Sequence, residues 1–228
     1  MIDQASGDGQ CLVLLGGPGI GKTALLRAAR EAARAAGFRL LAAVGVQSEA
    51  QLPFAGLHQV LRPLLRPVGG LPDQRRRALL TAFGLAEGDR PDIFAVAPAA
   101  VDLLGAAATE RPVAILVDDA QWLDEQSQEV LAFVAHRRAP LRIAIVGTVR
   151  TGYPGPFVSA GLPELAVSGV DGDAAKEILR GPAGVAGVVD RRRIRDQAQG
   201  NPLARWAASA VRPSRPDGPR RRRGLTVT

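Results

Sequence analysis

The sequence contains a single cysteine, only two lysines and no long uninterrupted apolar run. One cysteine, Cys11, cannot form a disulfide framework, which favours a reducing compartment such as the cytoplasm. The N-terminal residues lack the basic start and apolar core of a signal peptide. The longest apolar stretch, 93–108, is interrupted by Pro98 and Asp102, so no membrane span is expected. These absences predict a cytoplasmic protein that does not associate with membranes.

The positive charge of the sequence is concentrated at one end. Of a net charge of +7, residues 212–228 contribute six arginines and one aspartate, which leaves about +2 for the remainder. This segment is rich in Pro, Gly and Arg, so we predict a basic, disordered tail. Its four adjacent arginines, 220–223, would allow salt-sensitive nucleic-acid binding, which is one hypothesis. No recognition helix, aromatic platform or zinc-ligand spacing accompanies them.

Strand and helix patterns alternate through the first three quarters of the chain. This order predicts an α/β fold of three layers with a mainly parallel sheet. Apolar runs predict strands at 10–15, 38–46, 112–119 and 141–149, with a weaker one near 164–168. Helical patterns occur at 22–36, 54–68, 72–83, 92–108, 124–138, 171–180 and 190–199, and loops are expected at 47–53 and 151–163.

A glycine-rich loop follows the first strand and precedes the first helix. Its sequence, 16-GGPGIGKT-23, matches the G-x-x-x-x-G-K-[ST] pattern of the P-loop. The glycines allow backbone amides to approach phosphates, and Lys22 supplies a compact charge that the wide arginine fork would replace poorly. Thr23 offers a hydroxyl to Mg²⁺. The predicted nucleotide-binding residues here are Gly16, Gly17, Pro18, Gly19, Ile20, Gly21, Lys22, Thr23 and Ala24.

Two acids, Asp118 and Asp119, end the most apolar predicted strand. Ligands of open α/β sheets bind at the carboxyl ends of the strands, so this pair is expected beside the P-loop. We predict that Asp118 serves the Mg²⁺ site and that Asp119 polarises the attacking water. The alternative is that the pair only caps the following helix, although Asp124 is already placed to do that.

Five segments together resemble a known family. They are GGPGIGKT, 48-SEAQLPFAGLHQVLRPLL-65, ILVDDAQWLD, 145-IVGTVR-150 and 200-GNPLA-204. The combination resembles the signal-transduction ATPases with numerous domains. More closely, it is similar to the ATPase module of the bacterial LuxR-type large ATP-binding regulators. The similarity covers roughly residues 10–205.

The resemblance implies further features of fold and site. It implies an ASCE-type P-loop core, with an extra strand between the strands that carry the P-loop and the acids, followed by a helical lid. The ligands would be ATP and Mg²⁺. Lys22, Asp119 and Arg150 would act in catalysis, with Arg150 sensing the γ-phosphate and Thr148 as its neighbour. Pro202, in the GNP motif of the lid, would lie close to the nucleotide.

The sequence also departs from this family. It lacks the Gly-Arg-Glu segment that relatives carry before the first strand, and the apolar lid sequence ends after Leu203. We therefore expect a truncated or frameshifted member, or part of a split gene, without the C-terminal helix-turn-helix that binds DNA in intact relatives. The predicted domains are a P-loop core at 1–168, a partial helical lid at 169–211 and the tail at 212–228.

Two principal hypotheses for function follow. The first is a Mg-ATP-binding module that hydrolyses ATP slowly and acts as the nucleotide switch of a transcriptional regulator. The alternative is a nucleotide-binding or interaction module without turnover. A small-molecule kinase is disfavoured by the DDAQWLD segment, and self-association into a homo-oligomer remains open. His58 and Trp122 are expected to have packing roles.

Overall fold

A computed structural model describes residues 10–65, 70–89, 91–138 and 141–168. All of these lie in the first of two units of the chain, Met1–Ser168. The helices expected at 171–180 and 190–199, the partial lid, the tail and Pro202 lie outside the described residues.

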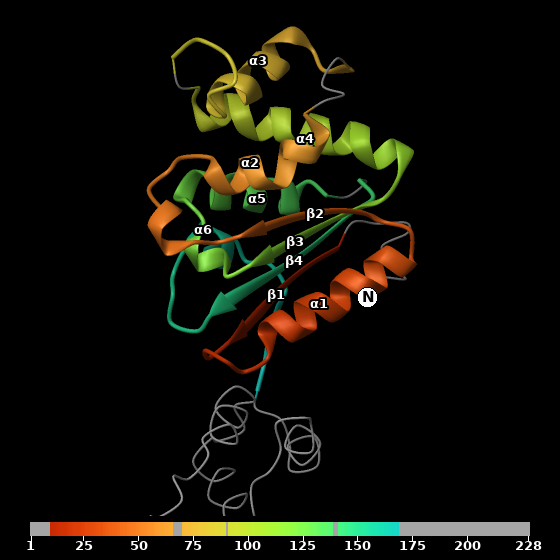
Figure 1. The fold of residues 1–228 in the computed structure, drawn as a ribbon, viewed down its shortest axis with the longest axis vertical. Coiled ribbons are helices and arrows are strands. Elements are labelled where there is room, and N and C mark those ends of the chain that lie inside the picture. Colours follow the sequence, from red (N-terminus) through yellow and green to blue (C-terminus); the bar gives the residue numbers. More distant parts are fainter. Residues whose placement is uncertain (1–9, 66–69, 90, 139–140, 169–228) are drawn as a thin grey trace, which may run out of the picture. The chain divides into compact units, whose positions relative to one another are not determined.

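A parallel sheet of five strands forms the centre of the fold (Figure 1). The spatial order is β2-β3-β4-β1-β5, and every pair of neighbours is parallel. The predicted three-layer α/β fold is therefore confirmed, including the strand β4 between β1 and β3. The strands are β1 Gln10–Gly16, β2 Arg39–Val44, β3 Val113–Asp118, β4 Ile143–Arg150 and β5 Glu164–Ala166.

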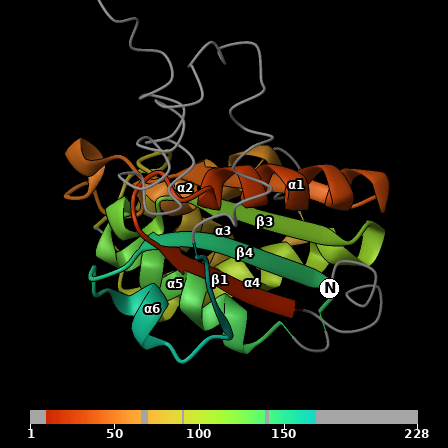
Figure 2. The ribbon, with the colours of Figure 1, turned by 90° about the horizontal axis from the view of Figure 1, so that it is seen from below.

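Helices cover both faces of the sheet, which explains why its central strands are apolar at nearly every position. Alternate residues of β3 face opposite layers: Ile115 belongs to the larger core cluster, whereas Leu116 packs with Leu26 of α1. Helix α1 lies on the opposite side of the sheet from α4 and α5 (Figures 1 and 2). The helices are α1 Lys22–Ala35, α2 Ala55–Leu61, α3 Asp73–Ala82, α4 Ile93–Glu110, α5 Glu125–His136 and α6 Pro156–Ser159.

Three predicted segments differ from the structure. The helix expected over 54–68 ends as an α-helix at Leu61 and continues as a 3₁₀ turn, Arg62–Leu64. Pro63 explains this end, because proline has no N–H to donate and its ring clashes with the carbonyl four residues earlier. The expected loop 47–53 contains a 3₁₀ turn, Gln47–Glu49, and the loop 151–163 contains the single turn of α6. Elements this short carry no periodic signal in a sequence.

Helix α4 is a core helix despite its strongly apolar composition. Among the described helices, it alone has the length and composition that would allow a membrane crossing. Its residues Val96, Leu103 and Leu104 are nevertheless buried in the main core with residues of α2, α5 and the sheet. Asp92 caps its first turn by accepting a hydrogen bond from the amide of Phe94 at 3.0 Å.

One buried carboxylate, that of Asp124, caps two helices at once. Its side chain is only 2% exposed and accepts a hydrogen bond from the Ser127 amide of its own helix α5 at 2.9 Å. It also accepts hydrogen bonds from the amides of Phe54 and Gly56, at 2.7 and 3.0 Å. These amides begin α2, whose N-cap residue Phe54 provides no side-chain cap and has a positive φ of 62°. The N-terminus of α2 is therefore completed by a residue seventy positions away in the sequence.

Asp124→Ala is expected to destabilise the domain by about 3–5 kcal/mol, because three buried N–H groups lose their acceptor. Asp92→Ala, which removes a single exposed cap, is expected to cost only about 1 kcal/mol. Urea denaturation followed by circular dichroism would measure both free energies of unfolding. Equal losses in the two variants would contradict the double-cap role of Asp124.

Candidate functional site

The loop between β1 and α1 has a backbone geometry suited to an anion. The helix N-cap is Gly21, which has a left-handed backbone with φ 109°, and no side chain caps the helix. The first turn also contains no acidic residue. The first hydrogen bond of the helix joins the Leu25 amide to the Gly21 carbonyl, so the amides of Lys22, Thr23 and Ala24 have no carbonyl partner within the helix. The positive end of the helix dipole also lies here. These features fit a phosphate group, whose oxygens would accept hydrogen bonds from these amides.

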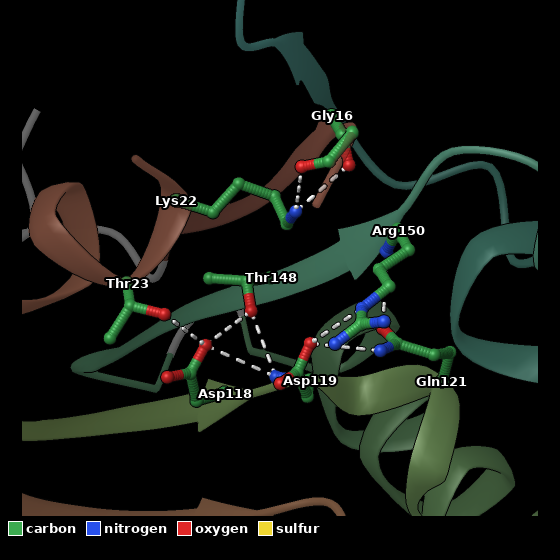
Figure 3. Close-up of polar contacts among 9 residues, drawn as sticks. Gly16, Lys22, Thr23, Asp118, Asp119, Gln121, Thr148 and Arg150 are labelled. Carbon is green, nitrogen blue, oxygen red and sulfur yellow. Dashed lines mark hydrogen bonds and ion pairs between the residues drawn. The ribbon is translucent and has the colours of Figure 1, made fainter. Parts of the chain in front are cut away.

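Lys22 is buried within this loop and is 7% exposed. Its Nζ donates hydrogen bonds to the carbonyl oxygens of Gly16 and Gly17, each at 2.8 Å (Figure 3). Burial lowers the pKa of Lys22 below its usual value, Asp119 opposes this shift, and Arg150 adds to it. The ammonium is thus enclosed by the loop and lies within the electrostatic field of groups at the ends of β3 and β4.

Asp118 connects the P-loop helix with the neighbouring strand. Its Oδ1 accepts hydrogen bonds from the hydroxyls of Thr23, at 3.3 Å, and of Thr148, at 2.6 Å. Thr148 is fully buried on β4 and in turn accepts the amide N–H of Asp119 at 2.8 Å. A hydroxyl and a carboxylate that converge from two elements are the few protein oxygens that a Mg²⁺–phosphate site requires. Among the described residues, no group of three or more His, Cys, Asp or Glu side chains could hold a metal ion.

Asp119 occupies a left-handed backbone conformation with φ 49°, which is uncommon outside glycine. Its Oδ1 accepts a hydrogen bond from Gln121 Nε2 at 2.9 Å and lies 3.6 Å from Arg150 Nε. Gln121 Oε1 accepts the amide N–H of Arg150 at 3.1 Å. Figure 3 shows that these side chains meet between the ends of β3 and β4. The pair Asp118–Asp119 does not cap α5, because Asp124 has that role.

Two residues near the acids were not identified from the sequence. Gln121 lies in the short 3₁₀ turn Ala120–Trp122, and the only signal was a polar residue between Ala120 and Trp122. Gly45 follows β2 and donates its amide to the carbonyl of Asp118 at 2.9 Å. A Cβ at this position would lie 2.1 Å from the carbonyl oxygen of Asp119, so only glycine allows this approach. A lone glycine between valines gives no indication of such a contact.

Other predicted residues lie elsewhere. His58 is on α2, where its ring contacts Phe83 with centroids 4.9 Å apart, and burial followed by the charge of Arg62 lowers its pKa. Trp122 is half-buried and contacts the ring of Tyr153 edge-on, with centroids 5.1 Å apart. The packing contact of Trp122 is thus with another aromatic ring, and Trp122 is not part of the main core cluster.

This geometry agrees with the comparison of the chain with known protein families. The family model of the AAA ATPase domain matches residues 2–146. The chain belongs to the AAA ATPase domain family. As a member of this family it is a nucleotide-binding module, and the family implies binding of a nucleotide, usually with Mg²⁺.

One solved structure shows the same fold as this AAA ATPase domain. Cdc6p from Pyrobaculum aerophilum matches with a TM-score of 0.56 and 21% identity, over 89% of this chain and 54% of that one. A DNA replication initiation factor matches with a TM-score of 0.48 and 13% identity, over 87% of this chain and 53% of that one. The AAA ATPase domain thus spans about half the length of each. No curated protein matches its sequence.

Proposed function

We propose that this AAA ATPase domain binds Mg-ATP and hydrolyses it slowly, and that it acts as the nucleotide switch of a transcriptional regulator. The observation that supports this best is the hydrogen bond between Thr23 and Asp118. It places the P-loop hydroxyl beside the first acid, where both oxygens can serve one cation. Lys22 and the N-terminus of α1 supply the charge and amides for the phosphates.

Each residue of the site has a distinct part in this proposal. Thr23 and Asp118 would hold Mg²⁺, directly or through water. Bound Mg²⁺ would neutralise charge on the phosphates and orient them. Asp119 accepts the proton of the attacking water, and Arg150 stabilises negative charge on the γ-phosphate after leaving its ion pair with Asp119. Thr148 orients both acids through its hydroxyl.

The regulatory part of the proposal rests on the resemblance to LuxR-type large ATP-binding regulators. Two segments that carry this resemblance, DDAQWLD and LPFAGL, are in contact in the structure. Asp124, the last residue of DDAQWLD, caps the helix that begins in LPFAGL. In this proposal, hydrolysis changes the state of the bound nucleotide, residues 169–211 respond to that change, and a partner or further segment with a DNA-binding module reads it.

A titration of ATP with and without Mg²⁺ tests the proposed site. We expect ATP to bind the wild-type chain at least about 10-fold more tightly in Mg²⁺ than in EDTA, because the cation offsets phosphate repulsion. Asp118→Asn should lose most of this difference, whereas Asp92→Asn, which lies on the distant α4 cap, should retain it. Equal affinity for ATP in Mg²⁺ and EDTA would contradict the assignment of Thr23 and Asp118.

The switch itself requires different conformations with ATP and ADP. Hydrogen exchange with mass spectrometry, in saturating Mg-ATP and in saturating Mg-ADP, should differ for peptides from residues 169–211. Identical exchange in the two nucleotides would exclude a switch in this chain. Release of phosphate no faster than in an Asp119→Asn control would favour the alternative, a nucleotide-binding or interaction module without turnover.

A further inference from the structure

We propose that Gln121 is a positioning residue for ATP hydrolysis, because its carboxamide holds the Asp119 carboxylate and the end of β4 in one arrangement. The inference rests on the proposed function, in which Asp119 accepts a proton from water. It concerns the 3₁₀ turn Ala120–Trp122, which connects the acid pair with α5.

The two hydrogen bonds of Gln121 define the direction of its carboxamide. Nε2 donates to Asp119 Oδ1 at 2.9 Å, and Oε1 accepts from the backbone amide of Arg150 at 3.1 Å. The reversed amide would place its NH₂ group against an N–H and its carbonyl against a carboxylate. A glutamate could accept from Arg150 but could not donate to Asp119, and a hydrocarbon side chain could do neither. The donor and the acceptor are therefore both required at this position.

This contact determines which oxygen of Asp119 is available for chemistry. Oδ1 receives the Gln121 hydrogen bond and faces the Arg150 guanidinium, with Nε at 3.6 Å. Within the described part of the chain, no donor contacts Asp119 Oδ2. The amide of Asp119 donates to Thr148 at 2.8 Å, so the backbone of this residue is held as well. Gln121 thus orients the carboxylate so that Oδ2 can accept a proton, which reduces the reorganisation required in the transition state.

The carboxamide also connects two strands that contribute different charges. Asp119 follows β3, whereas Arg150 ends β4. The hydrogen bond to the Arg150 amide sets the backbone position from which the guanidinium extends. It stays in place if the guanidinium leaves Asp119 for a phosphate, since it uses only the backbone of Arg150. Gln121 then remains the donor that orients the Asp119 carboxylate.

We expect Gln121→Ala to lower kcat for Mg-ATP about 10-fold, with KM and the Kd for Mg-ATP changed less than about 2-fold. Gln121→Glu should lose at least as much kcat, because it removes the donor and places a negative charge against Asp119. Gln126→Ala is the matched control, since Gln126 lies on α5 and its side chain has no hydrogen bond within the described residues. The control should retain wild-type kcat and KM.

A double-mutant cycle separates positioning of Asp119 from a general structural effect. In an Asp119→Asn background, Gln121→Ala should change the residual kcat less than about 2-fold, because its target is already altered. A second cycle uses thermal unfolding and needs no nucleotide. The midpoint of unfolding of the Gln121→Ala, Asp119→Ala double variant should fall by less than the sum of the decreases in the two single variants. Additive midpoint losses would overturn the contact.

The outcomes distinguish this role from the proposed function. Full kcat in Gln121→Ala, a tenfold loss that persists in the Asp119→Asn background, or a raised KM at constant kcat would each overturn the role of Gln121 alone. A wild-type chain that binds Mg-ATP but releases no phosphate would overturn the proposed hydrolysis and, with it, this role.

Discussion

Lys22→Ala is expected to weaken binding of Mg-ATP by at least about 100-fold, which corresponds to about 2.7 kcal/mol. Lys22 is the lysine of the P-loop, and its buried Nζ already lies within 2.8 Å of the Gly16 and Gly17 carbonyls. Phosphate oxygens can form stronger, charge-assisted hydrogen bonds with the same ammonium. Isothermal titration calorimetry with Mg-ATP would measure the change.

Two further variants make this prediction specific. Lys22→Arg keeps the positive charge but should also weaken binding about 10-fold or more, because the planar guanidinium does not fit the space of an ammonium. Arg27→Ala, on an exposed position of the same helix, should bind as the wild type does. Normal affinity in Lys22→Ala would show that the loop 16–23 is not the phosphate site.

Asp119→Asn is expected to leave binding of Mg-ATP within about 2-fold of the wild type and to lower kcat about 100-fold or more. The amide of asparagine is nearly isosteric with the carboxylate and can still accept the hydrogen bond from Gln121, but it cannot take a proton from water. Steady-state phosphate release at saturating Mg-ATP would measure kcat, and a nucleotide titration would measure affinity.

Asp118→Asn provides the contrast for this second prediction. Asp118 accepts hydrogen bonds from Thr23 and Thr148, so its change should weaken the dependence of ATP binding on Mg²⁺ as well as turnover. The change at Asp118 should therefore alter binding of Mg-ATP, whereas the change at Asp119 should alter only the rate of hydrolysis. Unchanged phosphate release in Asp119→Asn would assign the proton transfer to another group.

Most of the fold follows from local patterns in the sequence. Strands β3 and β4 are buried on both faces, so they appear as runs that are apolar at nearly every position, and the glycine loop appears between a strand and a helix. The segments that differ from the predicted pattern differ because of a proline or because they are very short. Pro63 converts the end of the second helix to a 3₁₀ turn, and α6 has only four residues, too few for periodicity.

Part of the candidate site could also be predicted from local sequence patterns. Lys22, Thr23, Asp118 and Asp119 occur in short motifs whose chemistry can be argued from their residue types and spacing alone. The parallel sheet then brings the ends of β1, β3 and β4 to one edge. The ion pair of Arg150 with Asp119 and the bridge made by Gln121 involve residues about thirty positions apart, so no local pattern contains them.

The sequence by itself determined the fold class, the P-loop and the presence of an acid pair, because each depends on neighbouring residues and on the period of apolar side chains. Only the tertiary structure decided which groups these residues contact. The amide of Gln121, the glycine at position 45 and the carboxylate of Asp124 act on partners from other strands and helices. Such contacts depend on the register of the strands and on the direction of side chains between layers. Both are set by the packing of the whole domain, so no local sequence pattern contains them.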